Sequence, residues 1–340
     1  MIDTQEFEPI APDQGPQVRR SLKANPGPAD RFFRGAVRGG GVAVLAIMLL
    51  VGSFLAYRGW QALHKAGLSF FTTQDWNPDA GRFGIAAVIV GTVLIAVVAI
   101  VVAMPLALGM ALYISEYAPG RIKSWMTSTV DLMAAVPSVV YGLWAVTLFE
   151  WKADSLSKWI SDWFGWIPIF KVDGVKRHDP LASMTRYTSS TFIAGIVVGI
   201  MVTPIACAIM RQAFSQAPAG EREGAYALGA TRWGMIRSVV LPFGQGAIIG
   251  GTMLGLGRAL GETIAVVMII SPVFQIRLHV LQNGTSSVSS LIALRYGEAS
   301  PFGISALMAA GLVLFAFTLG VNFVAASIVA RSRSGAVSEV

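Results

Sequence analysis

The chain has 340 residues, of which 54% are hydrophobic and only 13% carry a charge. Soluble domains contain about 25% charged residues, so this composition excludes an ordinary water-soluble fold. The net charge of +7 would suggest nucleic acid as the partner of a soluble protein, but in so apolar a chain it fits basic loops beside a membrane better. A single cysteine, Cys207, excludes an internal disulfide framework, and no cluster of metal ligands stands out. We therefore predict no metal site.

Six apolar segments are long enough to cross a bilayer. Its hydrocarbon core requires roughly 20 apolar residues in a helix, because every backbone polar group must be satisfied within the span. We expect spans at 36–57, 84–113, 125–149, 191–210, 244–272 and 302–330. The predicted fold class is an all-α integral membrane protein with six transmembrane helices over residues 36–330.

The two ends of the chain are polar, and the N-terminal end predicts the orientation of the protein in the membrane. Residues 1–35 hold five prolines and few large apolar groups, which predicts a disordered tail with no cleavable signal peptide. Six basic residues lie before or at the start of the first span, so the positive-inside rule places the N-terminus in the cytoplasm. Six crossings would return the tail at 331–340 to the same side. We expect a multi-pass protein of the cell membrane, inner or plasma.

A long external loop is expected at 150–190. Apolar residues recur there at helical spacing, opposite charged ones, which predicts an amphipathic helix. Its tryptophans would either anchor it at the lipid headgroups or form a docking surface for a partner. The apolar residues are Leu156, Trp159, Ile160, Trp163 and Ile167.

Three prolines lie within or near the ends of predicted spans: Pro105, Pro137 and Pro204. A proline removes an amide donor and commonly kinks a helix, so we predict kinks there. Glycines near residues 251–261 predict close approach to a neighbouring helix or to a second membrane subunit.

The loop at 211–243 carries the most specific motif, EREGAYALGATRWGMIRSVVLP, at 221–242. It resembles the coupling motif of permease subunits in ATP-binding-cassette importers. The matching positions are Glu223, Gly224, Ala225, Gly229, Leu241 and Pro242. Gly224 departs from the alanine usual in that family. The resemblance implies a cytoplasmic coupling helix that seats in a groove of an ATPase, with Gly229 in the following turn; the alternative is a plain linker.

The chain contains no GxxxxGK[ST] loop to cradle nucleotide phosphates. We therefore expect no enzymatic activity and no cofactor on this chain. ATP-Mg would be used by a partner ATPase.

Two charges lie in the fifth predicted span. Arg258 is near its middle, where a charge costs roughly 2.5–3.5 kcal/mol on insertion scales. Glu262 follows four residues later, so in a continuous helix both share one face. They would form either a structural ion pair or part of a substrate pathway.

The sequence around these charges, LGLGRALGETIAVVMII, is similar to the PstC family of phosphate permeases. Further similar segments are YISEYAP at 113–119, MAAVPSVVYGLWA at 133–145 and MVTPIACAIMRQAF at 201–214. The resemblance covers most of the chain from the second to the sixth span, but neither the N-terminal tail nor the long external loop. It implies that Arg258 and Glu262 take part in phosphate passage.

The resemblance also implies partners: a second permease subunit (PstA-like), an ATPase dimer (PstB-like) and an external phosphate-binding protein (PstS-like). Membrane lipid surrounds such a complex, and no nucleic acid is involved. Two alternatives stay open at this point. One is a permease subunit for another oxyanion, sulfate or molybdate, and the other is a secondary transporter.

Overall fold

The computed structural model describes residues 27–176, 178–179 and 182–333. The described chain forms two units, which meet between Val51 and Gly52. Helix α1 (Pro28–Ala66) runs across this boundary. The first unit is therefore its N-terminal part, and all other elements belong to the second unit.

Helix α1 begins at Pro28, so residues 28–35 are helical rather than part of the predicted tail. Proline suits a first helical turn because the amide there has no partner within the helix. Asp30 in that turn opposes the positive end of the helix dipole and pairs with Arg34 at 3.7 Å. The rest of the predicted N-terminal tail, 1–26, and residues 334–340 lie outside the described residues.

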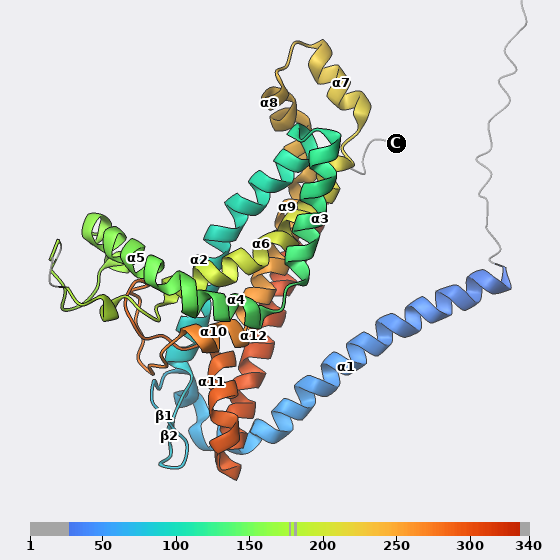
Figure 1. Ribbon diagram of the computed structural model, residues 1–340. Helices are drawn as coiled ribbons and strands as arrows, with labels where there is room; N and C mark the ends of the chain where they lie inside the picture. The colour runs from blue at the N-terminus through green and yellow to red at the C-terminus, as the bar shows by residue number, and fades with distance from the viewer. Residues whose placement is uncertain (1–26, 177, 180–181, 334–340) are drawn as a thin grey trace, which may run out of the picture. The chain divides into compact units, whose positions relative to one another are not determined.

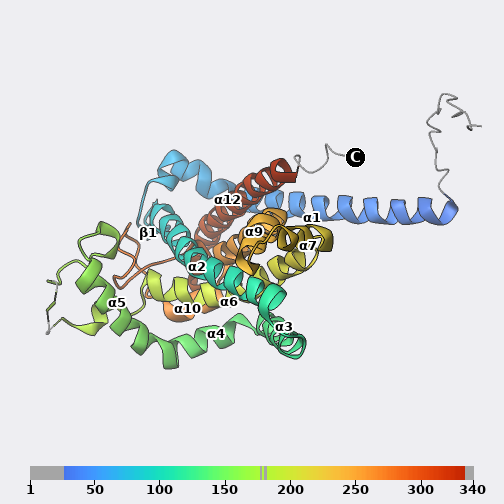
Figure 2. The same ribbon diagram turned by 90° about the horizontal axis from the view of Figure 1, so that it is seen from above.

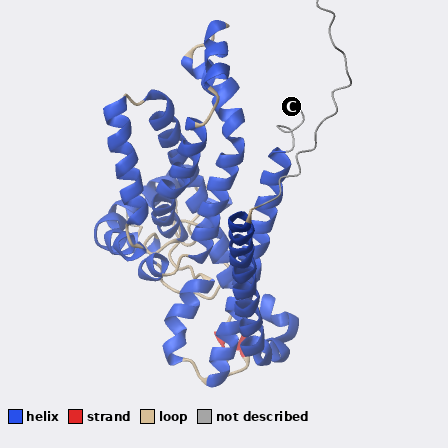
Figure 3. Cartoon of the chain, turned by 90° about the vertical axis from the view of Figure 1, so that its right-hand side faces the viewer, coloured by secondary structure: helices blue, strands red, loops and turns tan. Residues whose placement is uncertain are grey.

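The second unit is a helical bundle with one small hairpin (Figures 1 and 3). Its long helices besides α1 are α2 (Ala86–Leu112), α6 (Thr191–Ser215), α9 (Leu241–Gly261) and α12 (Pro301–Arg333). The shorter helices are α3 (Gly120–Ala135), α4 (Ser138–Trp144), α5 (Glu150–Phe164), α7 (Ala219–Ala227), α8 (Arg232–Met235), α10 (Ile264–Ile269) and α11 (Val288–Arg295). The hairpin pairs β1 (Trp76–Asn77) with β2 (Arg82–Phe83). π-helical turns extend α2, α4 and α8 at Tyr113–Tyr117, Ala145–Phe149 and Ile236–Val240.

The centre of the unit is built from small residues, which let α2, α6 and α9 approach closely (Figure 2). Alanines of α2 recur every three or four residues and are buried on one face: Ala96, Ala99, Ala103, Ala107 and Ala111. Opposite them, a Cβ added to Gly195 of α6 would lie 2.5 Å from Val98 Cβ. Close packing in this core therefore depends on the absence of side-chain bulk, as is common for helices in lipid.

The predicted span at 125–149 is sharply bent at Pro137, one of the three prolines at which we predict kinks. Helix α3 ends at Ala135, and the chain bends by 91° before a second helical segment runs from Ser138 to Phe164. Pro137 lies at the break, because it lacks an amide donor and restricts Val136 to an extended backbone, with ψ of 128°. The described residues thus contain five helices long and apolar enough to span a membrane, or six if the bent pair counts as one span.

Helix α5 lies in the predicted external loop and is amphipathic. Its buried face consists of Ala153, Asp154, Ser157 and Ser161. The tryptophans point away from that face, and Trp159 and Trp163 are 53% and 61% exposed. This arrangement leaves an aromatic surface for lipid headgroups or for a partner, and the choice between them stays a prediction.

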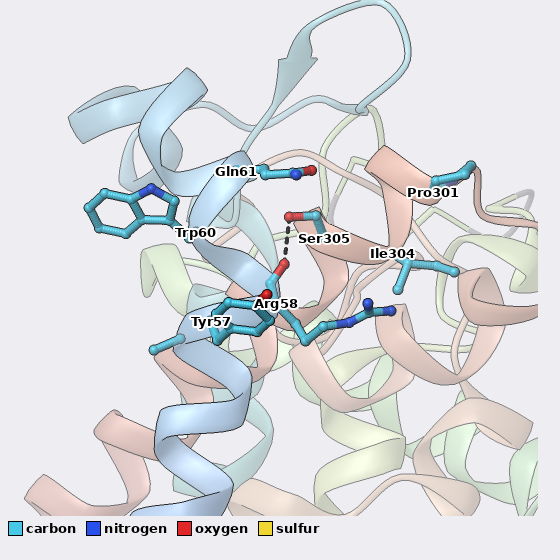
Figure 4. A pocket seen from close by; sticks show the side chains of 8 residues that line it. Tyr57, Arg58, Trp60, Gln61, Pro301, Ile304 and Ser305 are labelled. Atoms are coloured by element: carbon cyan, nitrogen blue, oxygen red, sulfur yellow. Dashed lines mark hydrogen bonds between the residues drawn. The ribbon is translucent and has the colours of Figure 1, made fainter.

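The C-terminal part of α1 packs against α12. A Cβ on Gly59 would lie 2.8 Å from the backbone nitrogen of Ala309, so only glycine allows this approach. Beside the contact is a pocket of about 690 Å³, in which the Ser305 hydroxyl donates to the Arg58 carbonyl at 2.7 Å (Figure 4). No residue of the predicted site is among those that line this pocket.

Candidate coupling loop and translocation site

The loop after α6 folds into two short helices joined by a tight turn. Gly229 follows α7 with a φ of +83°, a conformation that favours glycine. Its amide donates to the Tyr226 carbonyl at 2.9 Å, and the Ala230 amide donates to the Ala225 carbonyl at 3.0 Å. These two bonds form a Schellman motif, which closes the C-terminus of α7. The hydroxyl of Thr231 then accepts from the Gly234 amide at 3.1 Å and caps α8.

Helix α7 presents most of its residues to the outside. Glu223 and Gly224 are exposed, whereas Ala225 is partly buried against the bundle. Leu228, at the tip of the loop, is 91% exposed. Tyr226 and Trp233 of the same loop are also exposed, and a group of exposed apolar side chains suits contact with another protein more than a linker in water.

The motif ends where α9 begins. Leu241 packs against a buried cluster at this end of the bundle, and Pro242 occupies the first turn of α9. Helix α9 continues α8 and its π-helical turn without a gap, so Pro242 lies inside a helix that runs from Arg232 to Gly261. Its missing amide donor falls directly after the π-helical turn at Ile236–Val240.

The structure separates Arg258 from Glu262, so the predicted pair on one helical face does not form. Helix α9 ends at Gly261, and Glu262 has an extended backbone with ψ of 125°. Among the described residues no ion pair joins the two side chains. The Glu262 carboxylate instead accepts from the Ala265 amide at 3.3 Å, and its carbonyl accepts from the Ser289 hydroxyl at 2.8 Å. Glu262 thus stabilises the start of α10, and the single predicted span 244–272 is broken there.

Arg258 lies in a cleft between α6, α9 and α12 of about 760 Å³. Its side chain is exposed, and it is the only charged group among the described residues that line the cleft. Thr318 and Asn322 of α12 also line it, and the other lining residues are apolar or glycine. An apolar cleft with one cation and a few hydrogen-bonding groups is suited to a small anion.

Sequence reasoning missed two features of this region. Thr318 and Asn322 gave no motif, and only the tertiary structure brings α12 to the cleft. The break after Gly261 had a local signal, because glycine often follows the end of a helix.

Pro105 and Pro204 lie inside α2 and α6, and both helices continue past them, so kinks at these two positions stay predictions.

Arg222 of α7 was also not singled out. Its guanidinium donates to Glu116 Oε2 at 2.9 Å and to the Phe214 carbonyl at 2.5 Å. Glu116 lies in the π-helical turn that ends α2, and its side chain is only 3% exposed. A charge at position 222 could not be assigned a partner more than a hundred residues away without the fold.

Comparison with known proteins identifies the family. The family described as "Binding-protein-dependent transport system inner membrane component" matches residues 103–334. The chain is 34% identical to the "Phosphate transport system permease protein PstC" of Pasteurella multocida, over 84% of this chain and 87% of that protein. It is 36% identical to the protein of that name from Mycobacterium leprae, over 88% and 92% of the two chains. For "PstC 2" of Mycobacterium tuberculosis the identity is 34%, over 90% and 93%.

A solved structure titled "Inward facing conformations of the MetNI methionine ABC transporter: CY5 SeMet soak crystal form" covers 71% of this chain and 93% of its own. The identity is 14% and the TM-score is 0.49. So loose an overlap supports no argument about conformation or substrate. The family match and the PstC relatives cover most of the chain, and on them the chain belongs to the binding-protein-dependent inner membrane permeases, among the PstC permease proteins.

Proposed function

We infer that the chain is a permease subunit of an ATP-driven phosphate importer. The observation that carries this function is the match to PstC proteins over nearly the whole length of both partners. The chain would form half of a translocation pathway, with a PstA-like permease as the other half. ATP hydrolysis would take place on a PstB-like ATPase dimer, and a PstS-like binding protein would deliver phosphate from outside.

The loop of α7 and α8 is the proposed contact with the ATPase. Its exposed acidic helix and the exposed Leu228 at its tip support this role, because they form a surface that the described part of the chain does not cover. This end of the bundle would face the cytoplasm, and the hairpin and α5 would lie outside.

Arg258 is the proposed phosphate contact on this subunit. Its planar guanidinium can donate two hydrogen bonds to two oxygens of one anion. A phosphate that has lost part of its water in an apolar cleft gains most from such a cation, since charges interact strongly at low effective dielectric. In this conformation Glu262 accepts from α10, so among the described residues Arg258 has no ion pair to break before it binds an anion. We propose that Glu262 acts in the pathway by holding the helix break that follows Arg258.

Reconstitution tests this function. The chain, its permease partner, the ATPase and the binding protein are placed in vesicles, and ATP-dependent uptake of labelled phosphate is measured. We expect excess unlabelled phosphate to suppress the signal, and sulfate or molybdate at the same concentration to leave it intact. Uptake that sulfate or molybdate suppresses equally, or that persists without the ATPase, would contradict the proposal.

A further inference from the structure

A buried ion pair joins the coupling loop to the membrane core. The Arg222 guanidinium of α7 lies 2.9 Å from the Glu116 carboxylate at the end of α2. The Glu116 side chain is 3% exposed and that of Arg222 22% exposed, so water screens the pair weakly. Arg222 also donates to the Phe214 carbonyl near the end of α6. One side chain thus holds α7 to the ends of two long helices.

Besides this pair, α7 contacts α8 and the π-helical turn at Ile236–Val240. None of its residues is fully buried, and its apolar contact with the bundle is through Ala225, three residues after Arg222 on the same face. A charged pair is directional, because the guanidinium fork fixes both distance and angle to its acceptors. The position of α7 relative to α2 therefore depends chiefly on Arg222 and Glu116.

Helix α2 connects the turn that holds Glu116 to the part of the core where α2 packs against α9, just before Arg258. The Thr252 hydroxyl of α9 lies 2.9 Å from Met104 Sδ of α2. A Cβ added to Gly255 would lie 3.6 Å from Ile100 Cδ1 of α2 and 2.6 Å from Val202 Cγ1 of α6. Because this packing is tight, a displacement of α2 along its axis acts on α9 within one helical turn of Arg258.

We propose that Arg222 and Glu116 are the positioning residues through which movement of the coupling helix reaches α2 and the phosphate cleft. The inference rests on the proposed coupling role of the α7 loop. When the ATPase moves α7, the pair moves α2 with it as one body. Without the pair, α7 follows the ATPase while the membrane helices stay in place.

The test uses the whole complex in vesicles and a double variant, Glu116→Leu with Arg222→Met. Both charges are removed together, because apolar replacement of a buried ion pair is often neutral for stability whereas a lone buried charge is not. We expect the complex to assemble and to hydrolyse ATP, with phosphate transported per ATP reduced by about tenfold, within the usual range of coupling between sites. Normal transport per ATP in an assembled double variant would overturn the proposal. Failure to assemble would also overturn it, since the pair would then be a determinant of folding.

A matched control removes a second ion pair near the same end of the bundle. Arg211 of α6 pairs with Asp131 of α3 at 3.3 Å and does not involve α7. The double variant Asp131→Leu with Arg211→Met should retain transport per ATP. An equal loss in this control would show a general effect of lost ion pairs and would contradict the specific link.

A distance measurement separates movement from activity. In a Cys207→Ser background, spin labels are placed at Gly109 of α2 and Gly220 of α7, where an added Cβ meets nothing within 4 Å. We expect one distance with and without ATP when the pair is intact, and an ATP-dependent change in the Glu116→Leu/Arg222→Met chain. A change in the intact chain would overturn the proposal. If the turn variant Gly229→Trp, considered below, uncouples transport but the pair variant does not, the inference fails while the coupling role of the loop stands.

Discussion

At the scale of single residues, the coupling loop depends on one glycine conformation. Gly229 has a φ of +83° and nothing within 4 Å of an added Cβ, so its constraint is conformational and not steric within this chain. A non-glycine residue in such a conformation costs about 1–3 kcal/mol. Any side chain added there would also project from the surface that we propose for the ATPase.

We expect Gly229→Trp to lose ATP-driven phosphate uptake while the chain still inserts and assembles. The indole both strains the turn and prevents α7 from seating in the ATPase groove. Gly229→Asn is the control, because asparagine tolerates positive φ and is small, and it should retain most of the uptake. Uptake by the Trp variant at the unmodified rate would show that the loop is only a linker.

Arg258 is the second residue whose role can be tested alone. Arg258→Gln keeps hydrogen-bond donors but removes the positive charge, so phosphate uptake should fall by about a hundredfold if roughly 3 kcal/mol of charge stabilisation is lost. Arg58→Gln is the control: Arg58 is also exposed in a pocket, but it lies outside the Arg258 cleft, so its removal should leave uptake unchanged. Assembly is followed by co-purification with the other subunits, and a fully assembled Arg258→Gln complex with normal uptake would remove Arg258 from the pathway.

At the scale of elements, two helix breaks and one close helix contact position the site. The break at Pro137 turns the chain by 91°, and the break after Gly261 places Glu262 away from Arg258. Helix α9 packs closely against α2 and α6, because Gly255 leaves no room there for a larger side chain. The contribution of this helix contact to stability can be measured on the purified chain.

Gly255→Val should destabilise the chain by about 1–3 kcal/mol, because the added methyl groups would enter the space of Val202 and Ile100. Gly250 of the same helix is the matched control, since an added Cβ meets nothing within 4 Å. Gly250→Ala should be neutral or slightly stabilising because alanine is the better helix former. The measurement is thermal unfolding of the purified chain in detergent, and equal midpoints for both variants would contradict the packing argument.

At the scale of the whole molecule, the bent pair of α3 with α4 and α5 decides the topology. If the pair crosses the membrane as one broken span, the described residues contain six spans, and if it re-enters on one side, they contain five. The proposed orientation requires six. The two possibilities place the loop after α5 on opposite sides.

Reporters fused before Pro28 and at the exposed turn of Gly174 distinguish them. Three crossings separate these positions in the six-span topology, so the reporters should appear on opposite sides of the membrane. A third reporter after Val340 should match the one before Pro28. Reporters before Pro28 and at Gly174 on the same side would mean that the bent pair is re-entrant and that the six-span topology is wrong.

The sequence by itself determined the class of fold and the family. Long apolar segments have only one way to satisfy their backbone in lipid, so composition and length led directly to membrane helices. The small residues and glycine at 223–229 predicted a short helix and a turn in the proposed coupling loop, because capping and turn formation act over a few neighbouring residues. The turn at Gly229, which the motif predicted, follows from the same local chemistry.

Tertiary structure decided what each charge faces. Arg258 and Glu262 are four residues apart, and only the end of α9 at Gly261 shows that they do not pair. Arg222 and Glu116 are distant in the chain, and only the packing of α7 on the ends of α2 and α6 brings them to 2.9 Å. Ion pairs and clefts form between elements, whereas periodicity and motifs describe one element at a time. The partner of each charged side chain is therefore set by how the helices pack and where they break.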